Sequence, residues 1–168
     1  MPYSLVDSIS KSSKAHWSSL AKANQSRGLL LQAWKPPPPD WIKVSVDASF
    51  ADGKVVTGMV FRNHNHDSFM FAATYKEACL DPLSAECLAI LNTCKELEKA
   101  KIINAIVESD SLNAISVINV DSKNKFWTAA PIFVKIKSFK SVWPSWDFRY
   151  ISRNVNGAAH ALAHWAFD

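Results

Sequence analysis

The chain alternates between strand-like and helix-like patterns of apolar positions once it passes residue 40. Residues 42–50 carry apolar side chains at alternate positions, as in a half-buried strand. Residues 55–62 and 68–75 have strand patterns too, and the turn-forming residues 64–67 (HNHD) lie between them. The sequence therefore predicts that the first three strands form an antiparallel meander.

A helix is predicted directly after these strands. Asp81 suits its N-cap and Pro82 its first position, and apolar side chains then recur at helical spacing to residue 100 or 101. In the helix that follows the next strand, Leu112, Ile115 and Ile118 are expected to face inward. The remaining predicted elements are a strand at 105–109, helices at 111–119 and 131–142, a strand at 148–152 and a helix at 158–167. Strands joined by helical crossovers imply a mixed sheet with helices on its faces.

Four consecutive prolines, residues 36–39, mark a predicted boundary between an N-terminal arm (1–35) and a domain (40–168). A polyproline run joins neither a helix nor a central strand. Residues 13–34 are polar and weakly amphipathic, which predicts a helix within the arm. The serines and lysines of the arm faintly resemble an organelle transit peptide, and a plain linker or tail is the simpler interpretation.

The composition fits one ordinary folded domain. The chain has 168 residues, 48% of them hydrophobic, and no apolar run approaches the roughly 18 residues of a membrane span. Its three cysteines have no metal-ligand spacing, and Cys87 and Cys94 are expected to be core residues on one helix. We therefore expect a monomer in a reducing compartment, the cytoplasm or nucleus, with targeting to an organelle left open.

The net charge of +4 is unevenly placed. The arm region 1–40 has five basic and two acidic residues, so the domain itself is almost neutral. Residues 123–140 contain no acid and hold five lysines, Lys123, Lys125, Lys135, Lys137 and Lys140. Trp127, Trp143 and Trp146 lie in or near this stretch, a combination that suits a nucleic-acid backbone. A solvated helix face beside core aromatics explains the same pattern equally well.

Three carboxylates occur at the edges of predicted elements. Asp47 ends the strand-like run 42–47, Asp110 ends the run 105–110, and Glu86 lies at the margin of the apolar stripe of a helix. These side chains converge if the two strands are neighbours and the helix crosses above them. Converging carboxylates repel one another unless a cation lies among them. The sequence therefore suggests a divalent-metal site and phosphate chemistry.

Each carboxylate also has a simpler interpretation. Glu86 can reach solvent or pair with a lysine, Asp47 can terminate its strand, and Asp110 can cap the next helix. Glu108, on the same strand face as Asp110, is either an auxiliary charge or the surface partner of a lysine. The order of the three along the chain, more than any one of them, indicates a shared site.

Four segments, taken in order, resemble the motifs of the ribonuclease H family: residues 44–49 (VSVDAS), 85–89 (AECLA), 108–111 (ESDS) and 153–163 (RNVNGAAHALA). They most resemble the reverse-transcriptase-like ribonuclease H domain that is abundant in plant genomes and often derived from non-LTR retrotransposons. The resemblance covers about residues 34–168. It implies an α/β fold with a five-stranded mixed sheet in the order 3-2-1-4-5 and helices on both faces.

The resemblance also implies an activity, the endonucleolytic hydrolysis of the RNA strand of an RNA/DNA hybrid with two Mg²⁺ ions. Mg²⁺ prefers carboxylate oxygens and water, and Mn²⁺ can replace it. Two ions about 4 Å apart can activate a water and stabilise the leaving oxygen. By the same resemblance Asp47 bridges both ions, and Glu86 and Asp110 hold the ion near the leaving group.

Contacts with nucleic acid are expected in three places. The backbone region around the first carboxylate and the Glu helix reads the 2′-hydroxyl in the family, which here points to Ser49, Phe50 and Ser84. Lys123, Lys125 and Lys137 are expected to grip the DNA strand, and Asn156 of the last motif is a further expected contact.

His160 stands in the last motif where many relatives carry Asp, although the plant group commonly has His. Neutral imidazole is a poorer Mg²⁺ ligand than carboxylate, so a metal ligand, a proton shuttle and a helix-start residue all stay open as its role. His164 follows at the spacing of one helix face, but the sequence offers no third ligand for a zinc site. Gly58 matches the glycine of the family's second strand and predicts a close backbone approach.

Two other classes of function compete with the nuclease. One is a nucleic-acid-binding module that keeps the fold but cleaves poorly because of His160. The other is a domesticated retrotransposon domain that acts through protein contacts. A long-abandoned site is expected to lose at least one carboxylate, so the presence of Asp47, Glu86 and Asp110 favours the enzyme.

Overall fold

The computed structural model describes residues 34–65, 69–120 and 126–167. Most of the predicted arm helix, part of the predicted turn at 64–67, and Lys123 and Lys125 lie outside these ranges. The described residues form these elements: β1 (Ile42–Ala51), β2 (Lys54–Arg62), β3 (Phe69–Ala78), α2 (Pro82–Lys99), β4 (Ala105–Ser109), α3 (Leu112–Asn119), α4 (Ala130–Val142), β5 (Trp146–Tyr150) and α5 (Gly157–Phe167).

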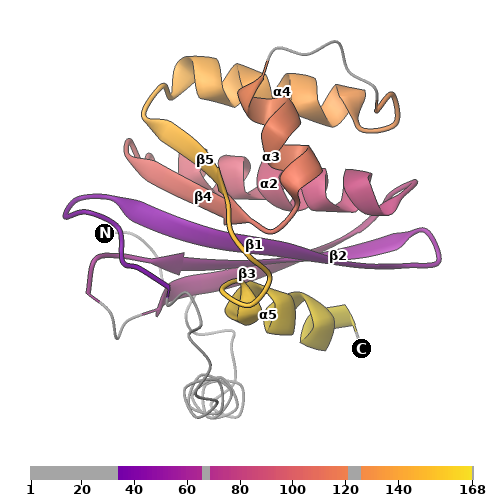
Figure 1. Ribbon diagram of the computed structural model, residues 1–168, viewed down its shortest axis with the longest axis horizontal. Helices are drawn as coiled ribbons and strands as arrows, with labels where there is room; N and C mark the ends of the chain where they lie inside the picture. The colour runs from indigo at the N-terminus through magenta and orange to yellow at the C-terminus, as the bar shows by residue number, and fades with distance from the viewer. Residues whose placement is uncertain (1–33, 66–68, 121–125, 168) are drawn as a thin grey trace.

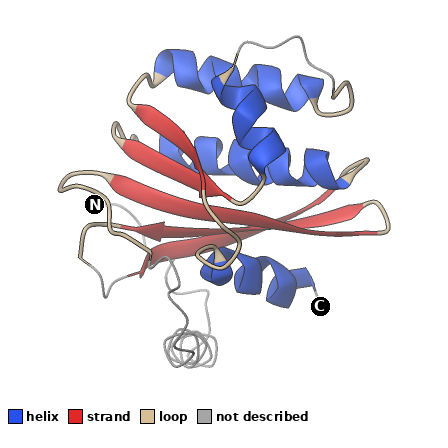
Figure 2. Ribbon diagram, viewed as in Figure 1, coloured by secondary structure: helices blue, strands red, loops and turns tan. Residues whose placement is uncertain are grey.

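The strands form one mixed five-stranded sheet in the order β3-β2-β1-β4-β5, which confirms the predicted fold class. β1, β2 and β3 make the expected antiparallel meander, whereas β4 runs parallel to both β1 and β5. α5 covers one face of the sheet, and α2, α3 and α4 cover the other (Figure 1 and Figure 2). The main core lies between the sheet and α2, and it contains Cys87 and Cys94 as buried free thiols, as predicted.

α2 begins and ends as the sequence predicts. Asp81 is its N-cap, where Oδ1 accepts a hydrogen bond from the Ser84 backbone N–H at 2.8 Å, and Pro82 occupies the first turn. The helix ends at Lys99, next to the predicted end. Glu86 lies in the second turn of α2, so the position of its side chain depends on where the helix begins.

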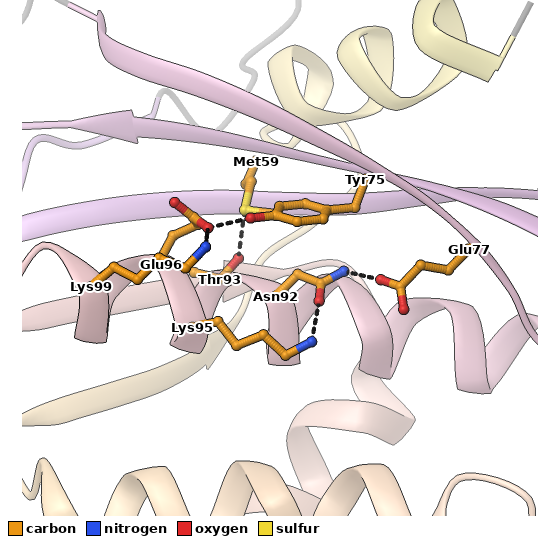
Figure 3. Close-up of polar contacts among 8 residues, drawn as sticks. All are labelled: Met59, Tyr75, Glu77, Asn92, Thr93, Lys95, Glu96 and Lys99. Carbon is orange, nitrogen blue, oxygen red and sulfur yellow. Dashed lines mark hydrogen bonds and ion pairs between the residues drawn. The ribbon is translucent and has the colours of Figure 1, made fainter. Parts of the chain in front are cut away.

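A polar seam, made of side chains of α2, β2 and β3, fixes the rotation of α2 over the sheet (Figure 3). The fully buried Asn92 donates to Glu77 Oε1 at 2.5 Å and accepts from Lys95 Nζ at 2.9 Å. The Tyr75 hydroxyl donates to the Glu96 carboxylate. Buried polar groups that have hydrogen-bond partners specify one arrangement, since a rotation of α2 about its axis would leave them unpaired.

α5 lies unusually close to the sheet at Gly58 of β2. A Cβ at this position would lie 2.7 Å from the Ala163 backbone N and 2.9 Å from the Ala159 carbonyl oxygen. The predicted close approach is therefore confirmed, and the small residues of α5 allow it from the side of the helix. Gly58 is paired in register with Asp47 of β1, so the same approach brings α5 near Asp47.

Three predicted details are wrong, two of them because of strand pairing. Leu112 is 58% exposed: Ser111 caps α3, and the buried face of the short helix is formed by Ala114, Ile115, Val117 and Ile118. β5 starts two residues before the predicted strand, because Trp146 is buried in register with Ala105 of β4. β3 continues to residue 78 because the start of β2 pairs with it.

Trp34, just before the prolines, folds back onto the sheet. Its ring lies 5.3 Å from Lys43 Nζ and 4.7 Å from Arg62 Cζ, measured to the ring centroid. Lys43 Nζ in turn donates to the Lys35 carbonyl at 2.7 Å and pairs with Glu108 at 2.8 Å. We call these contacts of Trp34 and Lys35 with β1 and β2 the Trp34 clasp. Glu108 thus has a lysine partner, but both side chains of the pair are buried rather than on the surface.

We expect Gly58→Ala to destabilise the protein by about 1–3 kcal/mol, the usual cost of overpacking a well-packed site. The added methyl group would meet backbone atoms of α5, which cannot rotate away as a side chain can. Thermal or urea unfolding measures the change. Lys54→Ala, at an exposed position of the same strand, is the matched control and should leave the transition unchanged. Equal stability of the Gly58→Ala variant and the parent would contradict the close approach.

Candidate metal centre

The candidate site lies where β4 ends beside β1. The last register pair of these strands is Val46 with Ser109, so Asp47 and Asp110 are the first residues beyond it. Glu86 approaches from α2, and one carboxylate oxygen from each of the three residues lies within 4.8 Å of the others. The structure thus brings together the three carboxylates that the sequence singled out.

Burial and mutual repulsion make this cluster costly without a cation. Burial, followed by the charges of Asp47 and Asp110, raises the pKa of Glu86 to about 9. Burial also raises the pKa of Asp47, which is 2% exposed, and the charge of Asp110 adds to this. Glu86 Oε2 has no hydrogen-bond partner among the described residues. Asp47 is buried, Glu86 and Asp110 are partly buried, and their clustered carboxylate oxygens fit a small hard divalent cation.

His160 approaches the Asp47 carboxylate from α5, on the face of the sheet opposite α2. Its Nδ1 lies 2.7 Å from Asp47 Oδ2, and its side chain is 45% exposed while that of Asp47 is buried. This hydrogen bond lowers the pKa of Asp47, against the larger effect of burial. The imidazole therefore joins the site through Asp47, and its outer edge faces solvent.

Arg153 is a residue of the site that the sequence analysis did not assign. Its Nε lies 3.5 Å from Asp110 Oδ2, and its charge also lowers the pKa of Glu86, opposing burial and repulsion. The guanidinium group is mostly exposed. Its position at the start of the last motif was the available signal, but only the fold shows that it meets Asp110.

Asn156 is a buried support of the site. Its side chain is fully buried, and Nδ2 donates to the Val46 carbonyl at 2.8 Å, directly before Asp47. It thereby ties the residue before α5 to the strand that carries the first carboxylate. The contact of Asn156 with nucleic acid that the sequence suggested stays a prediction.

The other predicted nucleic-acid residues are spread over several elements. Ser49 and Phe50 are partly exposed on β1 beyond Asp47, whereas Ser84 is buried and its hydroxyl donates to Asp81 Oδ2 at 3.0 Å. Lys137 is partly buried on α4. Of these residues, Ser49 and Phe50 are the ones that combine exposure with closeness in sequence to a site carboxylate.

The aromatic residues near the lysine stretch divide into two groups. Trp143 and Trp146 stack with ring centroids 5.4 Å apart, and Trp146 is buried, as the core interpretation predicts. Trp127 is 79% exposed. Within the described residues, then, Trp127 is the aromatic side chain of this stretch that is open to a flat partner.

None of the described helices is long and apolar enough to span a membrane.

Comparison with known proteins identifies the family. The sequence model of the family described as reverse transcriptase-like matches residues 45–166. Compared with curated proteins by sequence, the chain has no significant match.

Solved structures share its fold at low sequence identity. RNase H1 of the halophilic archaeon Halobacterium salinarum superposes with a TM-score of 0.69 at 14% identity, covering 76% of this chain and 98% of that one.

Two further structures agree with this fold. The N-terminal RNase H domain of a Mycobacterium tuberculosis protein gives a TM-score of 0.68 at 18% identity, over 76% of this chain and 94% of that one. LC11-RNase H1, isolated from compost and solved with an RNA/DNA hybrid, gives a TM-score of 0.63 at 20% identity. The match covers 76% of this chain and 99% of that one. At these identities the structures support the fold and leave the activity to be argued from the site.

We expect Glu86→Gln to stabilise the cation-free protein at pH 8 by roughly 1–3 kcal/mol. The pKa of Glu86 is raised in the folded state, so the folded state binds the proton more tightly than the unfolded one. The parent should therefore lose stability as the pH rises from about 4.5 towards 9, and the variant should lose less. Urea unfolding in EDTA across this range measures the difference.

A second measurement on the same variant separates cation binding from simple packing. Mg²⁺ should raise the melting temperature of the parent and do so much less for Glu86→Gln, because binding to the folded state stabilises it. Glu98→Gln, at an exposed position of α2, is the matched control. An equal response of the parent and Glu86→Gln to both pH and Mg²⁺ would remove Glu86 from the site.

Proposed function

Because the chain belongs to the reverse transcriptase-like family of ribonuclease H-like domains, we propose that it is a metal-dependent endonuclease that hydrolyses the RNA strand of RNA/DNA hybrids. The observation that carries the proposal is the convergence of Asp47, Glu86 and Asp110, whose oxygens lie within 4.8 Å of one another, with Asp47 buried and the other two partly buried. A purely structural cluster of this kind would cost stability without any return.

Asp47, Glu86 and Asp110 would hold Mg²⁺, with Mn²⁺ as a substitute. When bound, these ions supply an activated water and charge stabilisation at the phosphate. Glu86 must release its proton before it can act as a ligand, because its pKa of about 9 keeps it neutral at pH 7 in the cation-free protein. Binding should therefore become tighter as the pH rises.

Two cationic or ionisable side chains complete the proposed site. His160 orients the Asp47 carboxylate through its Nδ1, and its exposed edge can exchange a proton with solvent. Arg153, exposed beside Asp110, presents guanidinium donors that suit a phosphate oxygen of the substrate. Both act beside the carboxylates without adding negative charge to the cluster.

The family and the structural neighbours support the proposed substrate class. LC11-RNase H1 is described in complex with an RNA/DNA hybrid, which supports a hybrid as the substrate here. Ser49 and Phe50, partly exposed beyond Asp47 on β1, are our candidates for contact with the 2′-hydroxyl. Lys137 and Trp127 are candidates for the DNA strand, by charge and by stacking.

A second candidate function is a nucleic-acid-binding module of the same fold that cleaves poorly. The observation that favours it is His160, an imidazole bonded to Asp47 at the point where a further carboxylate would strengthen metal binding. Such a module would bind hybrid through its exposed basic and aromatic residues and show strong salt dependence without cutting.

We expect the protein to cut a labelled RNA/DNA hybrid in Mg²⁺ or Mn²⁺, and Asp47→Asn to lower the rate by at least about 100-fold. Loss of one preorganised charge-stabilising group commonly costs this much. Gel analysis of the labelled RNA strand measures the rate, with single-stranded RNA and duplex DNA of the same sequence as comparison substrates.

Asp52→Asn is the matched control, since the exposed Asp52 has a φ of 51° that asparagine also tolerates. It should cut the hybrid like the parent. If parent and Asp47→Asn cut equally, or neither cuts in either metal, the nuclease proposal fails. Salt-dependent binding of the hybrid without cleavage would then support the binding module.

A further inference from the structure

His160 and His164 lie one helical turn apart on α5, outside the cluster of three carboxylates. Their ring centroids are 6.2 Å apart, with the ring planes tilted by 51°. Residues four apart on a helix share a face, and both of these side chains reach solvent. After a rotation of the exposed His164 side chain, two imidazoles in this arrangement can direct a ring nitrogen each at one cation beside the helix.

Asp47 prepares His160 for such a role. The Nδ1 of His160 is engaged by Asp47 Oδ2 at 2.7 Å, and Asp47 is buried. An imidazole that donates through Nδ1 carries its lone pair on Nε2, the nitrogen that remains for a ligand. A carboxylate behind a histidine fixes the ring orientation and makes the free nitrogen a better metal ligand.

We propose that His160 and His164 form a chelating site for borderline transition-metal cations such as Ni²⁺. Imidazole nitrogen suits these ions, whereas carboxylate oxygen suits the hard cations of the neighbouring centre. Among the residues that the structure describes, Asp47, Glu86 and Asp110 are the group of three or more potential metal ligands, so the histidine pair supplies two protein ligands. Water completes the coordination, and the ion exchanges readily.

The location of this site has a consequence that rests on the proposed function. A cation on Nε2 makes Nδ1–H a stronger hydrogen-bond donor, which draws the Asp47 carboxylate more firmly towards His160. Asp47 is then less available to the ions of the carboxylate centre. Occupation of the histidine pair should therefore inhibit hybrid cleavage.

Calorimetric titration of the metal-free full-length protein with NiCl₂ tests the binding. The parent and His64→Ala, a matched variant of another exposed histidine, should bind Ni²⁺ alike at this site. His164→Ala should bind it at least about tenfold more weakly, because even the loss of a partner behind a ligand costs about that much affinity. A parallel titration with MgCl₂ should give the same result for all three proteins.

Unchanged Ni²⁺ affinity in His164→Ala, or no Ni²⁺ binding by the parent, would overturn the site. Because the titration contains no nucleic acid, this result is independent of whether the protein cuts hybrids. In the cleavage assay with Mg²⁺, added Ni²⁺ should inhibit the parent and His64→Ala more than His164→Ala. Binding without this difference would keep the metal site and overturn its coupling through Asp47.

Discussion

The early end of the β1–β4 pairing is the constraint on which the site depends. β4 stops at Ser109, opposite Val46, while β1 runs on beside β2. Asp47 therefore lies at the first point where β1 has an open edge inside the sheet. Side chains from both helix layers can reach it there, Glu86 from α2 on one face and His160 from α5 on the other.

The rest of the fold holds the two helices at this opening by different means. α2 is held by a polar seam whose buried partners permit one rotation, and α5 is held by direct backbone contact at Gly58. The raised pKa values of Asp47 and Glu86 indicate a cost in stability at the site itself. Such local costs are usual where a site must be ready for a ligand that binds only in the folded state.

Local patterns predicted most of the elements, and the Asp81 cap is one such short-range signal. Each of Asp47, Glu86 and Asp110 was a weak signal alone, and their order along the chain together with the family resemblance indicated a shared site, which their convergence supports. What depends on distant parts of the chain could not be predicted. The burial of Asn156 under Val46 and the meeting of Arg153 with Asp110 each join β1 or β4 to the segment before α5. Neither leaves a periodic trace in the sequence.

The Trp34 clasp changes how mechanical load would enter the domain. Tension on the chain before Trp34 meets the indole held between Lys43 and Arg62 before it reaches the stiff prolines or the turn at Asp40. Lys43 lies four residues before Asp47 on the same strand and is tied to Glu108 of β4. A pull from upstream would therefore act first on the contacts of Trp34 and Lys35 with Lys43 and Arg62, which lie between the arm and the strand that carries Asp47.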